Sequence, residues 1–207
     1  MGSMERDKAA ERFDSWSSNY EDSFAWRHYF MPLHDSLEKS IGGVTGKSVL
    51  DVGCGTGDML RRFARAGAGR LVGADASEGM LSVSRELSAG EPAIDFVRAS
   101  AEELPFEDAG FDLVISCIAF HHFPQPAASV AEMRRMLKPG GRLLIADLTD
   151  ETLRGKLMLA YGKVKRADRY YFSKGSMSGL FMDAGFEEVA SELIRAFPPT
   201  MLVTATK

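Results

Sequence analysis

Short apolar runs alternate with segments of helical periodicity along most of the chain. The apolar runs predict strands at residues 48–52, 70–75, 94–98, 111–117 and 142–148. The helical segments lie between them, at residues 59–64, 77–87 and 126–137. Ser77 and Pro126 are typical of helix starts. Strands and helices in this alternation predict a doubly wound α/β fold, and the almost wholly apolar run FDLVISC favours a parallel sheet buried on both faces.

The last part of the chain departs from this alternation. Residues 173–184 predict a helix that ends at Gly185, and residues 186–194 and 200–206 predict two strands. The connection Phe197-Pro198-Pro199 is short enough for a hairpin, so we expect the last strand to run antiparallel to its neighbour. The chain has no internal repeat or low-complexity segment.

Two glycine-rich turns, GGVTGKS at residues 42–48 and GCGTG at residues 53–57, could each bind a phosphate or a nucleotide. The first resembles the end of a Walker A loop, but that motif needs a glycine where this chain has Ile41. The motif also needs a strand before the loop and a helix after it, whereas Lys47 leads into a strand. We therefore interpret the first turn as a connection into the sheet.

The second turn follows a strand and precedes a helix, which is the order that ligand-binding turns need. Its glycines allow a sharp turn and a close approach of the backbone to a ligand. Its spacing is G-x-G-x-G, and Asp58 stands where a dinucleotide fingerprint has its third glycine. A carboxylate there would repel a pyrophosphate, so the sequence favours a nucleoside ligand without phosphates.

Ligands of such sheets lie beyond the carboxyl ends of the strands, so the residues that end each strand matter most. Asp75 ends the second strand, 22 positions after Gly53 (75 − 53), where a carboxylate can accept hydrogen bonds from both ribose hydroxyls. Its alternative is a solvent-exposed aspartate before a helix, and the upstream turn favours ribose binding. The turn RASAEELPF offers backbone N–H groups and the Ser100 hydroxyl to an adenine edge, a role that is compatible with a helix cap at Ser100.

The composition bounds the class of protein without changing this picture. The 207 residues are 45% hydrophobic and 26% charged, with a net charge of −4, which indicates one soluble globular domain without a basic footprint for nucleic acid. No apolar window is long enough for a membrane span and no signal peptide opens the chain, so we expect a cytoplasmic location. Cys54 and Cys117 lie far apart in the sequence, which favours a reducing compartment; no metal site is expected.

Five motifs, VLDVGCGTGD, GADAS, RASAEELPF, FDLVISCIAFHHF and MLKPGGRLLIADL, resemble in order and spacing those of class I S-adenosylmethionine-dependent methyltransferases. The resemblance covers the chain from about Phe13 and is greatest to the small-molecule branch with the ubiquinone/menaquinone-biosynthesis C-methyltransferases. It implies a Rossmann-like, mostly parallel seven-stranded sheet with an antiparallel last strand. It also implies an N-terminal helical lid over residues 1–40 and a single methyltransferase unit over residues 41–207.

The same resemblance implies S-adenosylmethionine as cofactor, S-adenosylhomocysteine as product and a small-molecule methyl acceptor. The glycine turn would hold the methionine part of the cofactor, Asp51 would orient that turn or reach the cofactor amine, and Asp75 would bind the ribose. Met80 would lie against the adenine and Ser116 under the methionine part. Ser100 stands where many relatives have Asp or Asn, so its hydrogen bond is expected to be weaker. The residues expected to bind the cofactor are Tyr20, Asp51, Gly53, Cys54, Gly55, Thr56, Gly57, Asp75, Ala76, Met80, Ser100, Ala101, Glu102 and Ser116.

Two histidines follow the fourth predicted strand, where relatives face the acceptor. Methyl transfer from a sulfonium is an in-line displacement that depends mainly on positioning, and a base is needed only where the nucleophile must lose a proton. His121 and His122 are candidate catalytic bases, with His122 slightly favoured. Their alternative is to cap the next turn or to pack beside Phe120 and Phe123. Cys117 is expected to pack rather than to react.

Two further segments bear on the acceptor. The aromatic stretch at residues 13–30 is typical of core packing, yet the resemblance implies a lid that covers the cofactor, with Tyr20 in contact. The segment at residues 150–171 is rich in Lys and Arg. It indicates either a solvated basic face or an acceptor that carries a carboxylate or phosphate.

Other functions are weighed against the same motifs. A nucleic-acid amino-methyltransferase would show an Asp/Asn-Pro-Pro-aromatic turn after the fourth strand, a metal-dependent catechol-type enzyme would need carboxylates there, and arsenite methylation would need more cysteines. A nicotinamide-dependent dehydrogenase is disfavoured by Asp58 and the missing third glycine. A cofactor-binding regulatory module without catalysis stays open, because the glycine turn and Asp75 report binding only. The acceptor, its methylated atom and the oligomeric state also stay open.

Overall fold

The apolar runs of the sequence form the strands of one sheet. The segments between the parallel strands return the chain to the end of the sheet at which each of these strands begins. The computed structural model describes residues 14, 20–24, 26–91, 94–164, 172–194 and 198–207, except for the side chains of residues 162–164. The strands are β1 (Ser48–Val52), β2 (Arg70–Asp75), β3 (Ile94–Arg98), β4 (Phe111–Cys117), β5 (Leu137–Leu148), β6 (Glu187–Ile194) and β7 (Thr200–Thr206). The α-helices are α2 (Met31–Ile41), α3 (Asp58–Arg65), α4 (Glu78–Leu87), α5 (Pro126–Met136), α6 (Leu153–Val164) and α7 (Lys174–Asp183).

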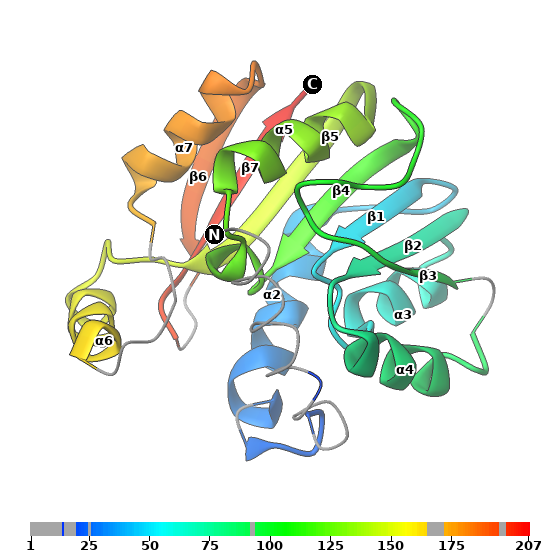
Figure 1. Cartoon of the computed structure of the whole chain (residues 1–207), viewed down its shortest axis with the longest axis horizontal. Helices are drawn as coiled ribbons and strands as arrows, with labels where there is room; N and C mark the ends of the chain where they lie inside the picture. The colour runs from blue at the N-terminus through cyan, green and yellow to red at the C-terminus, as the bar shows by residue number, and fades with distance from the viewer. Residues whose placement is uncertain (1–13, 15–19, 25, 92–93, 165–171, 195–197) are drawn as a thin grey trace.

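The sheet has seven strands in the order β3-β2-β1-β4-β5-β7-β6 (Figure 1). β1 to β5 pair in parallel, whereas β7 is antiparallel to both β5 and β6. This order confirms the expected doubly wound sheet with an antiparallel last strand. Consecutive strands run outward from β1 in one direction and from β4 in the other. The order therefore reverses between β1 and β4, which places a ligand crevice beyond their carboxyl ends.

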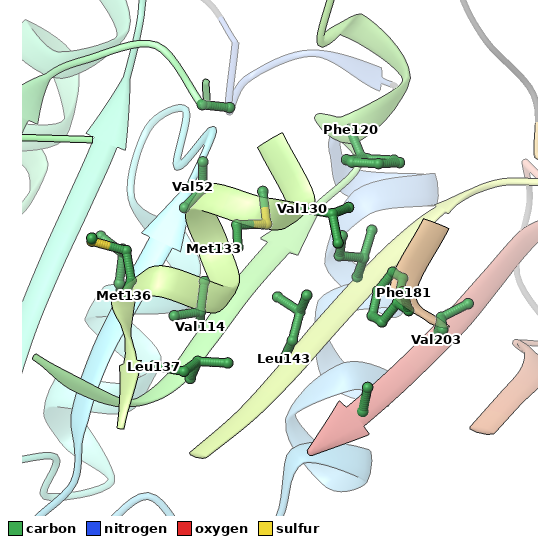
Figure 2. Packing of buried hydrophobic residues seen from close by; sticks show 14 of the residues in the cluster. Val52, Val114, Phe120, Val130, Met133, Met136, Leu137, Leu143, Phe181 and Val203 are labelled. Atoms are coloured by element: carbon green, nitrogen blue, oxygen red, sulfur yellow. The ribbon is translucent and has the colours of Figure 1, made fainter. Parts of the chain in front are cut away.

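Helices cover both faces of the sheet, and the strands alternate their side chains between the two faces. Val49 of β1 faces a core that includes α2, α3 and α4, while its neighbour Leu50 faces a core that includes α5 and α7. Figure 2 shows the second core, in which Val130 and Met133 of α5 and Phe181 of α7 pack over the central strands. Burial on both faces explains why these strands read as continuous apolar runs.

Local signals place several element ends where the sequence predicts them. The side chain of Ser77 accepts a hydrogen bond from the backbone N–H of Met80, at 3.1 Å, and caps α4. Pro126 lies in the first turn of α5, and Ser173 caps α7. The first glycine-rich turn, at residues 42–47, forms the connection from α2 into β1.

Two parts of the structure differ from the predicted elements. β5 begins at Leu137 rather than at residue 142, because Leu137 pairs with Phe111 ahead of an irregularity that contains the Pro139-Gly140-Gly141 turn. The segment after β5, whose secondary structure the sequence left open, forms α6. α6 mixes apolar and basic residues and leaves Leu153 and Leu157 exposed.

Some expectations fall on parts of the chain that are not described. Phe13 and Trp16 of the aromatic stretch, and the basic residues 165, 166 and 169, lie outside the described residues. Within the described ranges, no helix is both long and apolar enough to span a membrane.

Candidate functional site

A cavity opens beyond the carboxyl ends of β1, β2 and β4, where the strand order reverses. The space between its walls is about 1080 Å³, including the part that is open to solvent. One side, here called the strand-end wall, consists of residues 51–56, 58–59, 75–77, 80, 99–102, 117–119 and 122–124. The other side, here called the N-terminal wall, consists of Tyr20, Trp26, Phe30 and His34.

The glycine turn carries β1 into α3 through backbone conformations that favour glycine. Gly53, Gly55 and Gly57 have φ angles of 75°, 53° and 79°. A Cβ on Gly53 would lie 2.4 Å from the Cβ of Ala119, so Gly53 allows the turn to pack against the segment after β4. A Cβ on Gly55 would meet no protein atom within 4 Å. Gly55 therefore leaves open space beside the backbone at the cavity.

Asp75 ends β2 and holds the glycine turn in place through a hydrogen bond to its carboxylate. Its two carboxylate oxygens each accept a backbone hydrogen bond at 2.9 Å, Oδ2 from the N–H of Gly55 and Oδ1 from the N–H of Ser77. Burial raises the pKa of Asp75 above its ordinary value, and the backbone donors partly offset that rise. A carboxylate oxygen can accept more than one hydrogen bond. Asp75 therefore keeps acceptor capacity at the cavity after it has fixed the turn.

Asp51 is a buried carboxyl group at the floor of the cavity, with 3% of the residue exposed. Burial is the largest cause that raises its pKa to about 8, and the nearby charges of Asp75 and Asp58 contribute to the same rise. Its Oδ1 atom has no hydrogen-bond partner in the described part of the chain. A buried polar atom without a partner is costly, so Oδ1 is a candidate ligand-binding atom.

A histidine and an aspartate connect the two walls of the cavity. Nδ1 of His34 lies 2.8 Å from Oδ2 of Asp58, which also accepts a hydrogen bond from Nε of Arg62 at 2.7 Å. Burial raises the pKa of Asp58, but the hydrogen bonds and charges of His34 and Arg62 outweigh burial and hold it at about 2. An ionised carboxylate only accepts, so Nδ1 of His34 carries a proton. His34 is 7% exposed and its ring meets Trp26 edge to face, with centroids 5.4 Å apart.

The aromatic side chains of the N-terminal wall pack on one another. Tyr20 lies against Trp26 and Phe30, with ring centroids 5.4 and 5.9 Å apart. Trp26 and Phe30 belong to a single π-helical turn (Trp26–Phe30) that leads directly into α2. The wall therefore presents a continuous aromatic surface to the strand ends.

The residues after β2 and β3 form the far end of the strand-end wall. Met80 is buried at 2% exposure in the first turn of α4, and Ala101 is buried after β3. Ser100 and Glu102 also line the cavity there. The Glu102 carboxylate accepts hydrogen bonds from the N–H of Gln125 and the hydroxyl of Ser129, at 3.3 and 3.4 Å. Apolar surface and polar atoms thus meet at this end, as a purine ring requires.

The segment after β4 separates the two histidines of the sequence. His122 lines the cavity, whereas His121 is 2% exposed and turned toward Asp147 of β5. The Asp147 carboxylate accepts from the backbone N–H of His121 at 2.9 Å, and its other oxygen lies 2.6 Å from Nδ1 of the imidazole. Ile118, at the cavity, has φ of 52°, which is uncommon for a β-branched residue. This strain accompanies the turn that brings His122 to the cavity.

The structure brings most of the predicted site residues together at one cavity. Those that line it are Tyr20, Asp51, Gly53, Cys54, Gly55, Thr56, Asp75, Ala76, Met80, Ser100, Ala101, Glu102 and His122. Gly57, Ser116 and His121 are not among the lining residues. A Cβ on Gly57 would lie 3.1 Å from the ring of Phe96, away from the cavity, and Ser116 is buried within β4.

Sequence reasoning missed several residues of the cavity. His34, Phe30 and Trp26 line the cavity. The sequence marked Phe30 and Trp26 only as members of an aromatic stretch, and it did not mark His34. Leu33 and Leu37 form an i, i+4 apolar pair, which is a signal for a helix with one buried face. His34 follows Leu33 directly, so this pattern could have placed the histidine at the edge of that buried face. Its pairing with Asp58 spans 24 residues and has no local signal.

Comparison with known proteins places the chain in a family. Residues 50–145 match the family profile Methyltransf_11, described as a methyltransferase domain. The ubiquinone/menaquinone biosynthesis C-methyltransferase UbiE of Pseudomonas putida is 34% identical over 206 residues, 95% of this chain and 77% of that protein. The demethylmenaquinone methyltransferase of Clavibacter sepedonicus is 39% identical over 111 residues, 54% of this chain and 45% of that protein.

Solved structures share the fold over nearly the whole chain. A methyltransferase in complex with the Trm112 activator of Haloferax volcanii has a TM-score of 0.79 at 24% identity, over 94% of this chain and 96% of its own. Magnesium protoporphyrin IX methyltransferase from Synechocystis, with bound S-adenosylhomocysteine, has a TM-score of 0.77 at 18% identity, over 98% of this chain and 99% of its own. The [4+2]-cyclase SpnF has a TM-score of 0.80 at 17% identity, over 98% of this chain and 96% of its own. At these identities the likeness shows the fold alone.

The fold, the glycine turn after β1 and the curated relatives agree on one class. The chain belongs to the S-adenosylmethionine-dependent methyltransferases and is an enzyme of that class. Among the relatives it is similar to the UbiE-type C-methyltransferases, at 30–34% identity.

Proposed function

We propose that the protein transfers a methyl group from S-adenosylmethionine to a small-molecule acceptor in the cytoplasm. The observation that carries the proposal is a set of three carboxyl groups, Asp51, Asp58 and Asp75, around one cavity beyond the glycine turn. None of the described lining residues is a lysine or arginine. Such a cavity favours a ligand with positive charge and without phosphates.

The residues at the cavity fit this cofactor. When bound, S-adenosylmethionine supplies an activated methyl group on a cationic sulfur, and its amino group is a second cation. Oδ1 of Asp51 is the buried oxygen that an ammonium would satisfy. A pyrophosphate would instead add negative charge beside Asp58, which stays ionised with a pKa of about 2. The same residues therefore disfavour a dinucleotide.

Asp75 is suited to bind the ribose of this cofactor. Each of its oxygens already accepts one backbone N–H, which fixes the carboxylate in place, and each can accept one more hydrogen bond. Two ribose hydroxyls would complete that set. Met80, Ala101 and the polar atoms of Ser100 lie on the adjoining part of the strand-end wall and suit the adenine.

The acceptor would lie between the cofactor and the N-terminal wall. The relatives are named ubiquinone/menaquinone biosynthesis C-methyltransferases, and the aromatic faces of Trp26 and Phe30 suit a planar, partly apolar acceptor. His122 is a candidate base at the cavity where the nucleophile must lose a proton. His121 is held by Asp147 outside the lining, so we assign it a structural role.

Calorimetry with S-adenosylhomocysteine and NADH tests the cofactor, and mass spectrometry of a metabolite extract incubated with enzyme and methyl-labelled S-adenosylmethionine tests the reaction. We expect low-micromolar binding of S-adenosylhomocysteine, far weaker binding of NADH and at least one labelled product. Tighter binding of NADH would overturn the cofactor assignment. The same incubation is repeated with a demethylated quinol as the acceptor. If the protein binds the cofactor but neither the extract nor the quinol gives a labelled product, a regulatory module that binds the cofactor without catalysis is favoured.

A further inference from the structure

A carboxylate from the N-terminal part of the chain is bound directly to the glycine turn. Oε1 of Glu21 accepts a hydrogen bond from Oγ1 of Thr56 and one from Nη2 of Arg61, both at 2.6 Å. Nη1 of Arg61 also donates to the backbone oxygen of Thr56, at 2.5 Å. Glu21, Thr56 and Arg61 therefore form a closed ring of hydrogen bonds. The ring joins a residue next to Tyr20 of the N-terminal wall to a residue of the strand-end wall.

This ring determines which hydrogen bonds Thr56 can offer at the cavity. A hydroxyl has one proton, and Thr56 donates its proton to Glu21. Thr56 can then only accept hydrogen bonds from a ligand in the cavity. An acceptor-only hydroxyl complements an ammonium group, as the buried oxygen of Asp51 does. Without Glu21 the hydroxyl could rotate and donate instead.

The ring also satisfies a buried cation. Arg61 of α3 is 5% exposed, and it pairs with the carboxylates of Glu21 at 2.6 Å and Asp58 at 3.7 Å. A buried guanidinium that loses a close carboxylate partner is destabilising. The contact between Arg61 and Glu21 therefore favours the arrangement in which the N-terminal wall lies on the cavity.

A second acidic residue ties the same part of the chain to another segment of the strand-end wall. Oδ1 of Asp14 accepts from Oγ of Ser77 and from the backbone N–H of Gly79, at 2.5 and 2.8 Å. Ser77 caps α4 two residues after Asp75, whereas Thr56 lies just ahead of α3. The two carboxylates thus attach the chain to the strand-end wall at two points, with Tyr20 between them in the sequence.

We propose that Glu21 is a positioning residue that couples closure of the N-terminal wall to cofactor binding. This inference rests on the proposed function, because the ligand that it concerns is the cofactor. With Glu21 in place, the Thr56 hydroxyl is set to accept from the cofactor amine and Tyr20 is held at the cavity. Coupling is reciprocal, so bound cofactor in turn stabilises the closed wall.

The chain offers a matched control next to Glu21. Asp22 is a neighbouring acid with its side chain 81% exposed, and it pairs at the surface with Arg27, at 3.3 Å. We expect Glu21→Ala to weaken S-adenosylhomocysteine binding by about tenfold or more, as loss of charge-assisted hydrogen bonds does, and Asp22→Ala to change it less than about twofold. Glu21→Gln keeps an acceptor oxygen and is expected to lie between them. Calorimetry measures all three affinities, and circular dichroism checks folding.

Hydrogen exchange tests the coupling separately from affinity. We expect S-adenosylhomocysteine to protect the amides of residues 20–30 in the wild type and in Asp22→Ala, and to protect them less in Glu21→Gln. If the wild type binds the product and Glu21→Gln and Glu21→Ala bind it equally well with the same protection, the coupling is wrong and the proposed function stands. If the wild type does not bind the product, both are wrong. If Glu21→Ala does not fold, Glu21→Gln alone decides between these outcomes.

Discussion

The two walls of the cavity are held in place by different kinds of interaction. The strand-end wall is fixed by the register of parallel strands and by backbone hydrogen bonds, such as those from the N–H groups of Gly53 and Cys54 to the backbone oxygen of Ala74. The N-terminal wall reaches the cavity through side chains: Glu21 on Thr56 and His34 on Asp58. A substitution in the strand-end wall should therefore alter a preformed site, whereas one in the N-terminal wall should alter how the site closes.

This difference also divides the chemistry of the cavity. The carboxyl groups of Asp51 and Asp75 belong to the rigid wall, where they cannot move away from one another and burial raises both of their pKa values. The aromatic surface of Trp26 and Phe30 belongs to the wall held by side chains. A charged wall suits a cationic ligand, and an aromatic wall suits a planar, partly apolar one.

Substitution of Asp75 should show the largest effect on the strand-end wall. Asp75→Ala removes both candidate ribose acceptors and the acceptor of the Gly55 N–H, so we expect the affinity for S-adenosylhomocysteine to fall by about 2–4 kcal/mol. Asp75→Asn should lose less, because its amide oxygen still accepts. Calorimetry on both variants provides the measurement. An unchanged affinity in Asp75→Ala would remove the ribose role.

Asp51 should show opposite effects on stability and on binding. Its folded-state pKa of about 8 exceeds its ordinary value of 3.8, so the folded protein holds a proton that the unfolded chain releases. The free energy of unfolding therefore falls as pH rises from about 4 to about 8. Asp51→Asn cannot ionise, and we expect it to raise the free energy of unfolding at pH 8 by roughly 1–3 kcal/mol and to flatten this pH dependence. Urea unfolding at several pH values measures both.

The same substitution should weaken binding of a cationic ligand. An ammonium beside Asp51 lowers the pKa of its carboxyl group, so the wild type should release a proton on binding below about pH 8, and its affinity should rise with pH up to that value. Asp51→Asn should lack this rise. Calorimetry in buffers of different ionisation enthalpy detects the proton. Equal proton release by both proteins would place the titrating group elsewhere.

Two glycines with the same backbone preference separate binding from folding. Gly46 and Gly55 have φ angles of 72° and 53°, and a Cβ on either would meet no protein atom within 4 Å. Alanine at each should therefore cost about 1–2 kcal/mol of stability through backbone strain. Only Gly55 lies at the cavity, so only Gly55→Ala should weaken S-adenosylhomocysteine binding, by a further ~1–2 kcal/mol. Equal binding by both variants would mean that no ligand approaches Gly55.

The sequence predicted the strand-end wall well because its signals are local. β1 to β4 follow apolar runs, and Asp51 and Asp75 can be placed from the strand to which each belongs. The predicted start of β5 was wrong. Leu137 pairs with Phe111 of β4 ahead of an irregularity, and this pairing depends on the neighbouring strand rather than on a local signal. The sheet order needed the family resemblance, since nothing local fixes which strands pair.

The N-terminal wall was harder to predict because its contacts are distant in sequence. Glu21 meets Arg61 and His34 meets Asp58, at separations of 40 and 24 residues, and neither pair leaves a periodic pattern. His121 and His122 illustrate the same limit. They are adjacent in sequence, but the turn after β4 directs one to Asp147 and the other to the cavity.

The smallest effect is expected at Asp58, where the two walls are linked. Its folded-state pKa of about 2 lies below the ordinary 3.8, so the carboxylate contributes stability that is present above about pH 4 and is lost as pH falls toward 2. Asp58→Asn keeps the shape but not the charge that His34 and Arg62 face. We expect it to lower the free energy of unfolding by about 1 kcal/mol at pH 7, and the difference from the wild type to shrink as pH falls below 4. Urea unfolding between pH 7 and pH 3 measures it. A difference that stays constant over this range would show that the walls are linked by the shape of Asp58 rather than by its charge.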